Sequence, residues 1–173
     1  MMAKDKKKSG WNGFSLRPRK EMPEGLWLGC PGCKEMLFRK TMEENLHVCP
    51  ECGYHFRIDG PTRIAQLADE GSFEELGADL ASSDPLKFTW GQQDYKDRIH
   101  VDPEKAAAHE AMLAGKAFIR GRGVMLAAMN FTFLGGSMGM VVGEKFCLAV
   151  ERAMEENLPL LVVSCSGGAR MHE

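Results

Sequence analysis

The chain has 173 residues, 44% of them hydrophobic, which suffices for one ordinary domain and a small additional module. Its formal charge is −2, but residues 1–63 hold 12 Lys and Arg against 8 Asp and Glu. That local excess is too small for a dense nucleic-acid-binding patch. No apolar run approaches the roughly 20 residues that cross a bilayer, and no apolar stretch follows the N-terminal lysines, so nothing indicates export or a membrane partner.

The first third of the chain combines a charged terminus with paired cysteines. Residues 1–24 mix Lys, Arg, Pro and Gly with few apolar positions, which predicts a flexible basic arm. Residues 25–58 alternate short β-prone runs with cysteine-containing turns, a pattern typical of a zinc ribbon. The cysteines form two Cys-x2-Cys pairs separated by fifteen residues. They are Cys30, Cys33, Cys49 and Cys52.

Two such pairs that face each other place four thiolates around one tetrahedral zinc ion, with Zn–S distances of ~2.3 Å. Because protein ligands fill every position, none is open to water, and the predicted metal is structural rather than catalytic. Two disulfides or free thiols are the alternatives, together with a redox site. Disulfides are typical of secreted miniproteins, and a redox site is typical of a single Cys-x2-Cys motif at a helix start, so the zinc ribbon fits better.

From residue 59 onwards the pattern is that of an α/β domain, which we expect to occupy residues 59–173. Apolar residues at helical spacing predict a helix from 61 to about 71, and a second short helical stretch around 73–76. Residues 80–99 lack a regular pattern and are expected to be a connection. A helix is predicted over 103–114, because an aspartate and a proline precede it and a glycine follows it.

The remaining elements follow in the order expected of a layered sheet. Residues 116–131 predict a β-hairpin with a glycine-rich turn, and a second glycine-rich stretch follows at 134–139. Apolar residues at helical spacing predict a helix over 142–156, with Cys147 as a packing residue. Residues 160–164 predict a buried parallel strand, and a further helix is expected to start near Ala169.

Two glycine pairs are candidate functional residues. Gly167 and Gly168 follow the predicted strand, so their backbone N–H groups can converge on a developing negative oxygen, as in an oxyanion hole. A plain strand-to-helix turn explains the pair equally well. Gly135 and Gly136 indicate close approach of the backbone to a ligand or a neighbouring strand. Cys165 is expected to be an inert buried thiol, and no Gly-x-Ser-x-Gly motif supports a nucleophilic serine.

Six stretches, in order, resemble the carboxyltransferase β subunit of multisubunit bacterial or plastid acetyl-CoA carboxylase. The resemblance implies that the α/β domain is crotonase-like and that Gly167 and Gly168 hold a reacting carbonyl oxygen. We take Gly135, Gly136 and Arg170 as candidate substrate-binding residues. The chain departs from the family where Cys165 and His172 stand in place of Ala and Gln. The six stretches are 23–27, the four cysteines, 84–88, 95–98, 135–139 and 166–171.

The resemblance also implies an activity and an assembly. The reaction moves a carboxyl group from carboxybiotin to acetyl-CoA and forms malonyl-CoA, the first committed step of fatty acid synthesis. The implied partners are a carboxyltransferase α subunit in a heterotetramer of two α and two β subunits, a biotin carboxyl carrier protein and an ATP-using biotin carboxylase. Family members continue for over a hundred residues with a second glycine pair, so we expect a truncated chain that is inactive alone. The expected location is the bacterial cytoplasm or the plastid stroma.

A second class of function stays open at this point. A zinc ribbon with a basic surrounding can bind nucleic acid weakly when aromatic and basic side chains alternate on its surface. The ribbon partly meets that description. A hydratase or thioesterase on a crotonase-like scaffold is a further alternative, but the zinc ribbon argues against it. The relevant ribbon residues are Phe38, Arg39, Lys40, Tyr54, Phe56 and Arg57.

Overall fold

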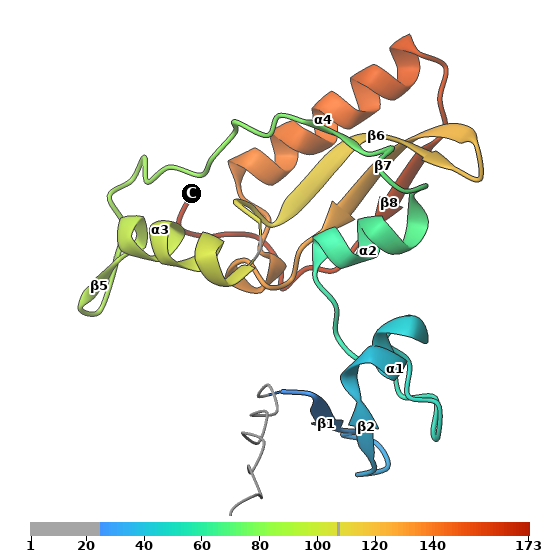
Figure 1. The fold of residues 1–173 in the computed structure, drawn as a ribbon. Helices are drawn as coiled ribbons and strands as arrows, with labels where there is room; N and C mark the ends of the chain where they lie inside the picture. The colour runs from blue at the N-terminus through green and yellow to red at the C-terminus, as the bar shows by residue number, and fades with distance from the viewer. Residues whose placement is uncertain (1–24, 107) are drawn as a thin grey trace, which may run out of the picture.

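The computed structural model describes residues 25–106 and 108–173, so the predicted arm at 1–24 lies outside the described residues (Figure 1). The first described elements form a small ribbon. In it, β1 (Trp27–Gly29) pairs antiparallel with β2 (Met36–Phe38), and α1 (Arg39–Glu44) follows. The β-prone pattern of this segment gives no indication of α1, whose buried residue is Met42. The ribbon has a core of its own, made of Cys30, Leu37, Met42 and Cys49, with Phe56 packed against it.

The larger part of the chain is built on a four-stranded sheet in the order β3-β6-β7-β8. β6 (Met112–Ile119) and β7 (Arg122–Met129) form the predicted hairpin, and β3 (Glu74–Leu76) pairs antiparallel with β6. The chain then crosses over through α4 (Met140–Glu155) to β8 (Leu160–Val163), which pairs parallel with β7. The hairpin, the long helix and the parallel strand therefore agree with the sequence pattern.

Helices cover both faces of this sheet, α4 on one side and α2 (Gly60–Leu67) on the other (Figure 1). β7 is buried on both faces, and its alternate residues divide between two cores. Met125 and Ala127 pack with the α4 core, which includes Ala149. Their neighbours Val124, Leu126 and Ala128 pack with Ile64 of α2. The near-continuous apolar sequence of β7 follows from this double burial.

Local capping explains where α2 begins. The Asp59 carboxylate accepts a hydrogen bond from the Thr62 N–H at 2.8 Å, and Pro61 occupies the first turn, where no N–H is needed. α2 ends at Leu67, a few residues before the glycine at which its end was expected. None of the helices in the described ranges is long and apolar enough to cross a membrane.

Two predicted helices are wrong. Residues 73–76 contain β3, and the helix predicted over 103–114 is replaced by the end of α3 (Tyr95–Ala106) and the start of β6. Gly115 lies inside β6, opposite Glu75, and a Cβ atom there would overlap the carbonyl oxygen of Glu74. The glycine therefore permits close approach of two strands and does not end a helix. The expected connection also contains two short strands, β4 (Thr89–Trp90) and β5 (Gln93–Asp94), and the first residues of α3.

The last predicted elements are partly wrong. β8 is parallel, as expected, but it is the last strand in the described sheet, and Leu161 and Val162 are each 38% exposed. The helix expected near Ala169 is not formed up to residue 173. Ala169 instead pairs with Met138 in a parallel bridge. Cys147 is exposed on α4 and is not a packing residue.

Two glycine substitutions are expected to change stability in opposite directions. Gly115→Ala places a methyl group against the Glu74 carbonyl and the Phe73 ring, so we expect a loss of about 1–3 kcal/mol in the free energy of unfolding. Gly143→Ala adds a methyl group inside α4, where no atom lies within 4 Å, and is expected to add about 0.5–1 kcal/mol. Denaturant unfolding of the two variants measures both. Equal effects at the two positions would contradict the close approach of β3 and β6.

Candidate metal centre and glycine-lined site

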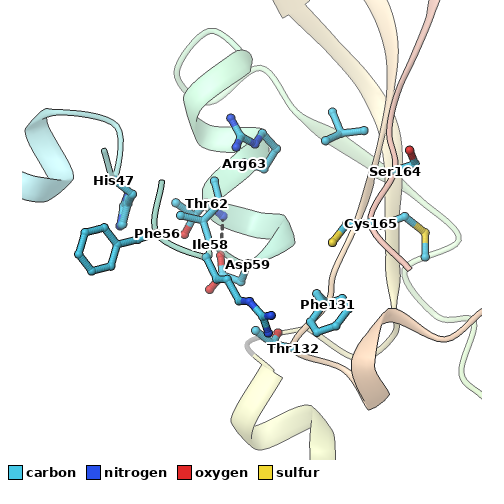
Figure 2. A pocket seen from close by; sticks show the side chains of 13 residues that line it. His47, Phe56, Ile58, Asp59, Thr62, Arg63, Phe131, Thr132, Ser164 and Cys165 are labelled. Carbon is cyan, nitrogen blue, oxygen red and sulfur yellow. Dashed lines mark hydrogen bonds between the residues drawn. The ribbon is translucent and has the colours of Figure 1, made fainter. Parts of the chain in front are cut away.

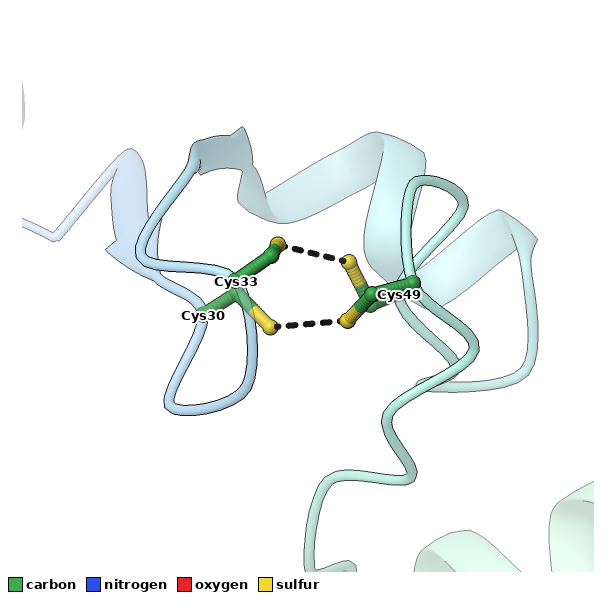
Figure 3. Close-up of side chains that lie close together, drawn as sticks. Cys30, Cys33 and Cys49 are labelled. Carbon is green, nitrogen blue, oxygen red and sulfur yellow. Dashed lines mark hydrogen bonds between the residues drawn. The ribbon is translucent and has the colours of Figure 1, made fainter.

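The four cysteine sulfur atoms of the ribbon converge on one point (Figure 3). Cys30 Sγ lies 3.6 Å from Cys52 Sγ, and Cys33 Sγ lies 3.8 Å from Cys49 Sγ. All four atoms are within 4.8 Å of one another. A tetrahedron with Zn–S bonds of ~2.3 Å separates its sulfur atoms by about 3.8 Å, so the spacing fits a single zinc ion.

The closeness of the sulfur atoms makes the pKa values of these thiols unequal. Burial raises the pKa of Cys30, but the N–H groups of Cys33 and Gly32 outweigh it and bring the pKa to about 7. The Glu35 N–H lowers the pKa of Cys33, yet burial and the neighbouring sulfur atoms raise it to about 12. The four thiols therefore do not all ionise at neutral pH by themselves. A divalent cation stabilises all four as thiolates.

The two glycine-rich stretches, remote in sequence, lie side by side at the end of β8. The Gly167 N–H donates to the Gly135 carbonyl oxygen at 3.0 Å. Gly136 has a φ of +65°, and a Cβ atom on it would lie 2.6 Å from the Cys165 carbonyl oxygen. Only glycine tolerates both the left-handed backbone and this close approach. Gly136 thus permits close approach of the backbone to the segment that follows β8.

The backbone amides of the second glycine pair are not equivalent. The Gly167 N–H is held by the Gly135 carbonyl, whereas the Gly168 N–H donates to the Ser166 hydroxyl at 3.0 Å. Ser166 is exposed, and its hydroxyl can rotate away. Gly168 has a φ of +117° and no atom within 4 Å of the position that a Cβ would take. An incoming oxygen can thus replace the hydroxyl at the Gly168 N–H more easily than it can replace a backbone carbonyl at Gly167.

Arg170 lies in a buried ionic network rather than on an open surface. Its side chain is 1% exposed, with Nη2 at 2.6 Å from Glu110 Oε1 and Nη1 at 3.0 Å from Glu173 Oε1. The guanidinium also donates to the Ser137 hydroxyl and carbonyl. Burial lowers the pKa of Arg170, but Glu110 outweighs burial, so the pKa is raised overall. Arg170 therefore links the two glycine-rich stretches inside the fold. Its guanidinium is buried and is not accessible to a substrate.

Sequence reasoning missed the other members of this network. Glu110 is 1% exposed, and the only signal for it is a carboxylate that directly precedes a run of apolar residues. It also accepts a hydrogen bond from Ser82, which lies in the predicted connection. Tyr95 donates to Glu173 and stacks on His172, with ring centroids 4.9 Å apart. Burial raises the pKa of Glu173, but the Tyr95 hydroxyl, the Met140 N–H and Arg170 lower it more.

A cavity of about 660 Å³ lies between the ribbon and the larger domain (Figure 2). His47, Phe56 and Arg57 line it from the ribbon side. Arg63 of α2 and the residues at the ends of β7 and β8 line it from the other side. Cys165 faces this cavity and is exposed, contrary to the expectation of a buried thiol. The cavity thus reaches the segment that leads into the glycine pair.

Comparison with known families agrees with both parts of the chain. The family model of the acetyl-CoA carboxylase zinc finger domain matches residues 27–52, and that of the carboxyl transferase domain matches residues 61–173. The chain therefore belongs to the carboxyl transferase domain family. Transcarboxylase 12S, solved with hydrolysed methylmalonyl-coenzyme A bound, shares 29% identity at a TM-score of 0.53, over 68% of this chain and 20% of that one. A single-chain long-chain acyl-CoA carboxylase shares the fold at 23% identity and a TM-score of 0.53, over 66% of this chain and 11% of that one.

Two curated relatives share a higher sequence identity with this chain than those solved structures do. The acetyl-coenzyme A carboxylase carboxyl transferase subunit beta of Carboxydothermus hydrogenoformans is 47% identical over 155 residues, 90% of this chain and 54% of that protein. The subunit of the same name from Synechococcus is 44% identical, over 91% of this chain and 50% of that protein. The chain thus spans about half the length of the curated relatives that it matches.

Proposed function

We propose that this chain is the N-terminal part of a subunit that transfers the carboxyl group of carboxybiotin to acetyl-CoA and forms malonyl-CoA. The observation that carries the proposal is the contact of the two glycine turns at the end of β8. This contact leaves the Gly168 N–H held by nothing stronger than an exposed hydroxyl. The matching relatives are named for this activity and support the choice of substrate. By itself this part of the subunit is expected to be inactive.

The chemistry suits a site made of backbone amides. Carboxybiotin, carried in by a separate protein, would release CO2 as its N–C bond breaks, and the electron pair left on the ureido nitrogen would take the proton from the acetyl methyl group. The resulting enolate carbon would then form a bond to the carbon of the released CO2, so no side-chain base would be required. The Gly168 N–H would donate to the reacting carbonyl oxygen, and Gly167, fixed by the Gly135 carbonyl, would hold the turn in shape. Arg170 and Gly136 act as positioning residues.

The ribbon and the partner proteins complete the proposal. Zinc held by Cys30, Cys33, Cys49 and Cys52 is structural, because the four sulfur atoms leave no open position. A carboxyltransferase α subunit, a biotin carboxyl carrier protein and an ATP-using biotin carboxylase are the proposed partners, and the bacterial cytoplasm is the proposed location. A nucleic-acid-binding ribbon module is not favoured, since the carboxyl transferase family match continues through residue 173.

Gly168→Val tests the proposed amide donor. Valine keeps the backbone N–H but does not readily adopt the φ of +117°, so the donor should move out of position. We expect kcat to fall by roughly 100- to 1,000-fold, while the KM for acetyl-CoA changes little. The assay is malonyl-CoA formation by the complete subunit assembled with its α partner. Gly71→Val is the matched control, because Gly71 also has a positive φ, +68°, and no atom within 4 Å, but lies in the loop before β3. Normal malonyl-CoA formation by Gly168→Val, or an equal loss in both variants, would reject the proposal.

A further inference from the structure

We propose that the cavity between the ribbon and α2 binds the nucleotide end of acyl-CoA, so that the zinc ribbon forms one wall of the substrate site. This inference rests on the proposed function. It assigns a role to the ribbon that a purely structural metal module would not have. The volume of about 660 Å³ lies within the ~300–1,000 Å³ common for sites of small organic ligands.

The charges and rings of the cavity suit a phosphorylated nucleotide. Arg57, in the segment between the ribbon and α2, and Arg63 of α2 both line the cavity, and guanidinium groups pair well with phosphate oxygens. The single carboxylate in the lining, Asp59, is engaged with the Thr62 N–H as the cap of α2. Phe56 and Phe131 supply aromatic surface for a flat base, and the Arg57 guanidinium lies 5.2 Å from the Phe131 ring centre. The site therefore combines anion and ring recognition.

The ribbon contacts the larger domain at this cavity. His47 Nδ1 lies 3.4 Å from Gln66 Nε2 of α2, which ties the ribbon to the helix beside the opening. His47 and Phe56 belong to the ribbon (Figure 2), and Arg57 directly follows Phe56 in the chain. Folding of the ribbon around its metal thus sets the position of this wall.

The far wall of the cavity continues into the glycine site. Val163, Ser164 and Cys165 line the cavity, and Gly168 follows three residues after Cys165. The pantetheine arm of CoA is long and flexible, so a nucleotide in the cavity is compatible with a thioester at the glycine turns. A single-stranded nucleic acid needs an open, strongly basic groove, which two arginines in a cavity do not provide.

Two ligands that differ only in the nucleotide part can show whether the cavity binds that part of CoA. In the complete, assembled transferase, Arg57→Ala and Arg63→Ala are each expected to raise the dissociation constant for acetyl-CoA by about tenfold. The same variants should bind acetyl-pantetheine, which lacks the nucleotide, as tightly as the unmodified protein does. Arg122→Ala, an exposed arginine at the start of β7, is the control and should bind both ligands normally. Titration calorimetry measures all the dissociation constants.

Two thiols give a second readout in the unmodified protein. Cys165 lines the cavity, whereas Cys147 is exposed on α4 and belongs to no part of the lining. Adenosine 3′,5′-bisphosphate should slow the alkylation of Cys165 by iodoacetamide and leave Cys147 unaffected. Mass spectrometry follows both sites in one sample.

Distinct outcomes overturn the inference and the proposed function. The inference is wrong if the arginine variants weaken acetyl-CoA and acetyl-pantetheine equally, or weaken neither. It is also wrong if they weaken binding of a single-stranded RNA and leave acetyl-CoA unchanged. If nucleotide binding follows the expected pattern but the assembled protein forms no malonyl-CoA, the cavity assignment stands and the proposed function fails.

Discussion

Replacing Cys49 by serine is expected to release the metal and unfold the ribbon while the larger domain stays folded. Zinc contributes about 10–16 kcal/mol of apparent binding energy in small zinc-finger peptides, and that energy is also their folding energy. The ribbon core is small and contains Cys30 and Cys49 themselves, so little else stabilises it. The larger domain has two cores of its own, on the two faces of the sheet. Zinc analysis and amide hydrogen exchange of residues 25–58 against 61–173 measure the outcome.

Cys147→Ser is the matched control for this experiment. Cys147 is exposed on α4, outside the four-cysteine cluster, so its replacement should keep the full zinc content and normal exchange protection. Acidification should imitate Cys49→Ser, because the ligands bind metal as thiolates and protons compete for them as pH falls. A Cys49→Ser variant that keeps one equivalent of zinc and a protected ribbon would contradict the tetrahedral site.

Replacing Arg170 by methionine is expected to cost about 3–5 kcal/mol in the free energy of unfolding. Removal of one partner leaves the opposite charge buried without compensation, and here two carboxylates lose the same guanidinium. The side chains of Glu110 and Glu173 are 0% and 2% exposed, so water does not replace Arg170 without rearrangement. Chemical denaturation of the complete subunit gives the value. Glu110→Gln should cost less, because Arg170 keeps Glu173 and gains a neutral acceptor.

Arg152→Met provides the control for lost charge at the surface. Arg152 pairs with Glu155 and Glu156 at 3.7 Å on the exposed side of α4, where such pairs contribute at most about 1 kcal/mol. Equal losses in the free energy of unfolding for Arg152→Met and Arg170→Met would contradict a larger contribution from the buried network than from a surface ion pair.

The buried network of Arg170 also predicts how the stability of the protein changes with pH. The folded pKa of Glu173 lies below its ordinary value of 4.5, so its contribution to stability is present above that value. The contribution is lost as pH falls through the folded pKa. Arg170→Met removes one cause of the lowered pKa, and the variant should therefore lose less additional stability on acidification than the unmodified protein.

Local signals explain which elements could be predicted from the sequence. The paired cysteines, the glycine turn of the β6–β7 hairpin and the helical spacing of α4 each lie within a short stretch, and the structure confirms them. The helix predicted over 103–114 failed because Gly115 has the sequence context of a helix end but is required by a contact with Glu74. That contact is between strands far apart in the chain, which local pattern does not reveal.

The functional site also combines features that the local sequence reveals with contacts between distant segments that it does not reveal. Each glycine stretch is visible alone, but the bond between Gly167 and Gly135 depends on the crossover through α4. Arg170 belongs to a stretch that resembles the family, but its burial against Glu110 depends on a contact between residues sixty positions apart in the chain. The metal ligands are the part of the site that spacing alone identifies.

The outer edge of β8 has a consequence for how such a subunit is made. Leu161 and Val162 remain partly open to water beside a strand edge that no other described strand pairs with. Uncovered aliphatic edges recruit strands from other molecules and so promote aggregation. We therefore expect a chain with this edge uncovered to aggregate, for example during its synthesis, unless a chaperone or a partner covers the edge.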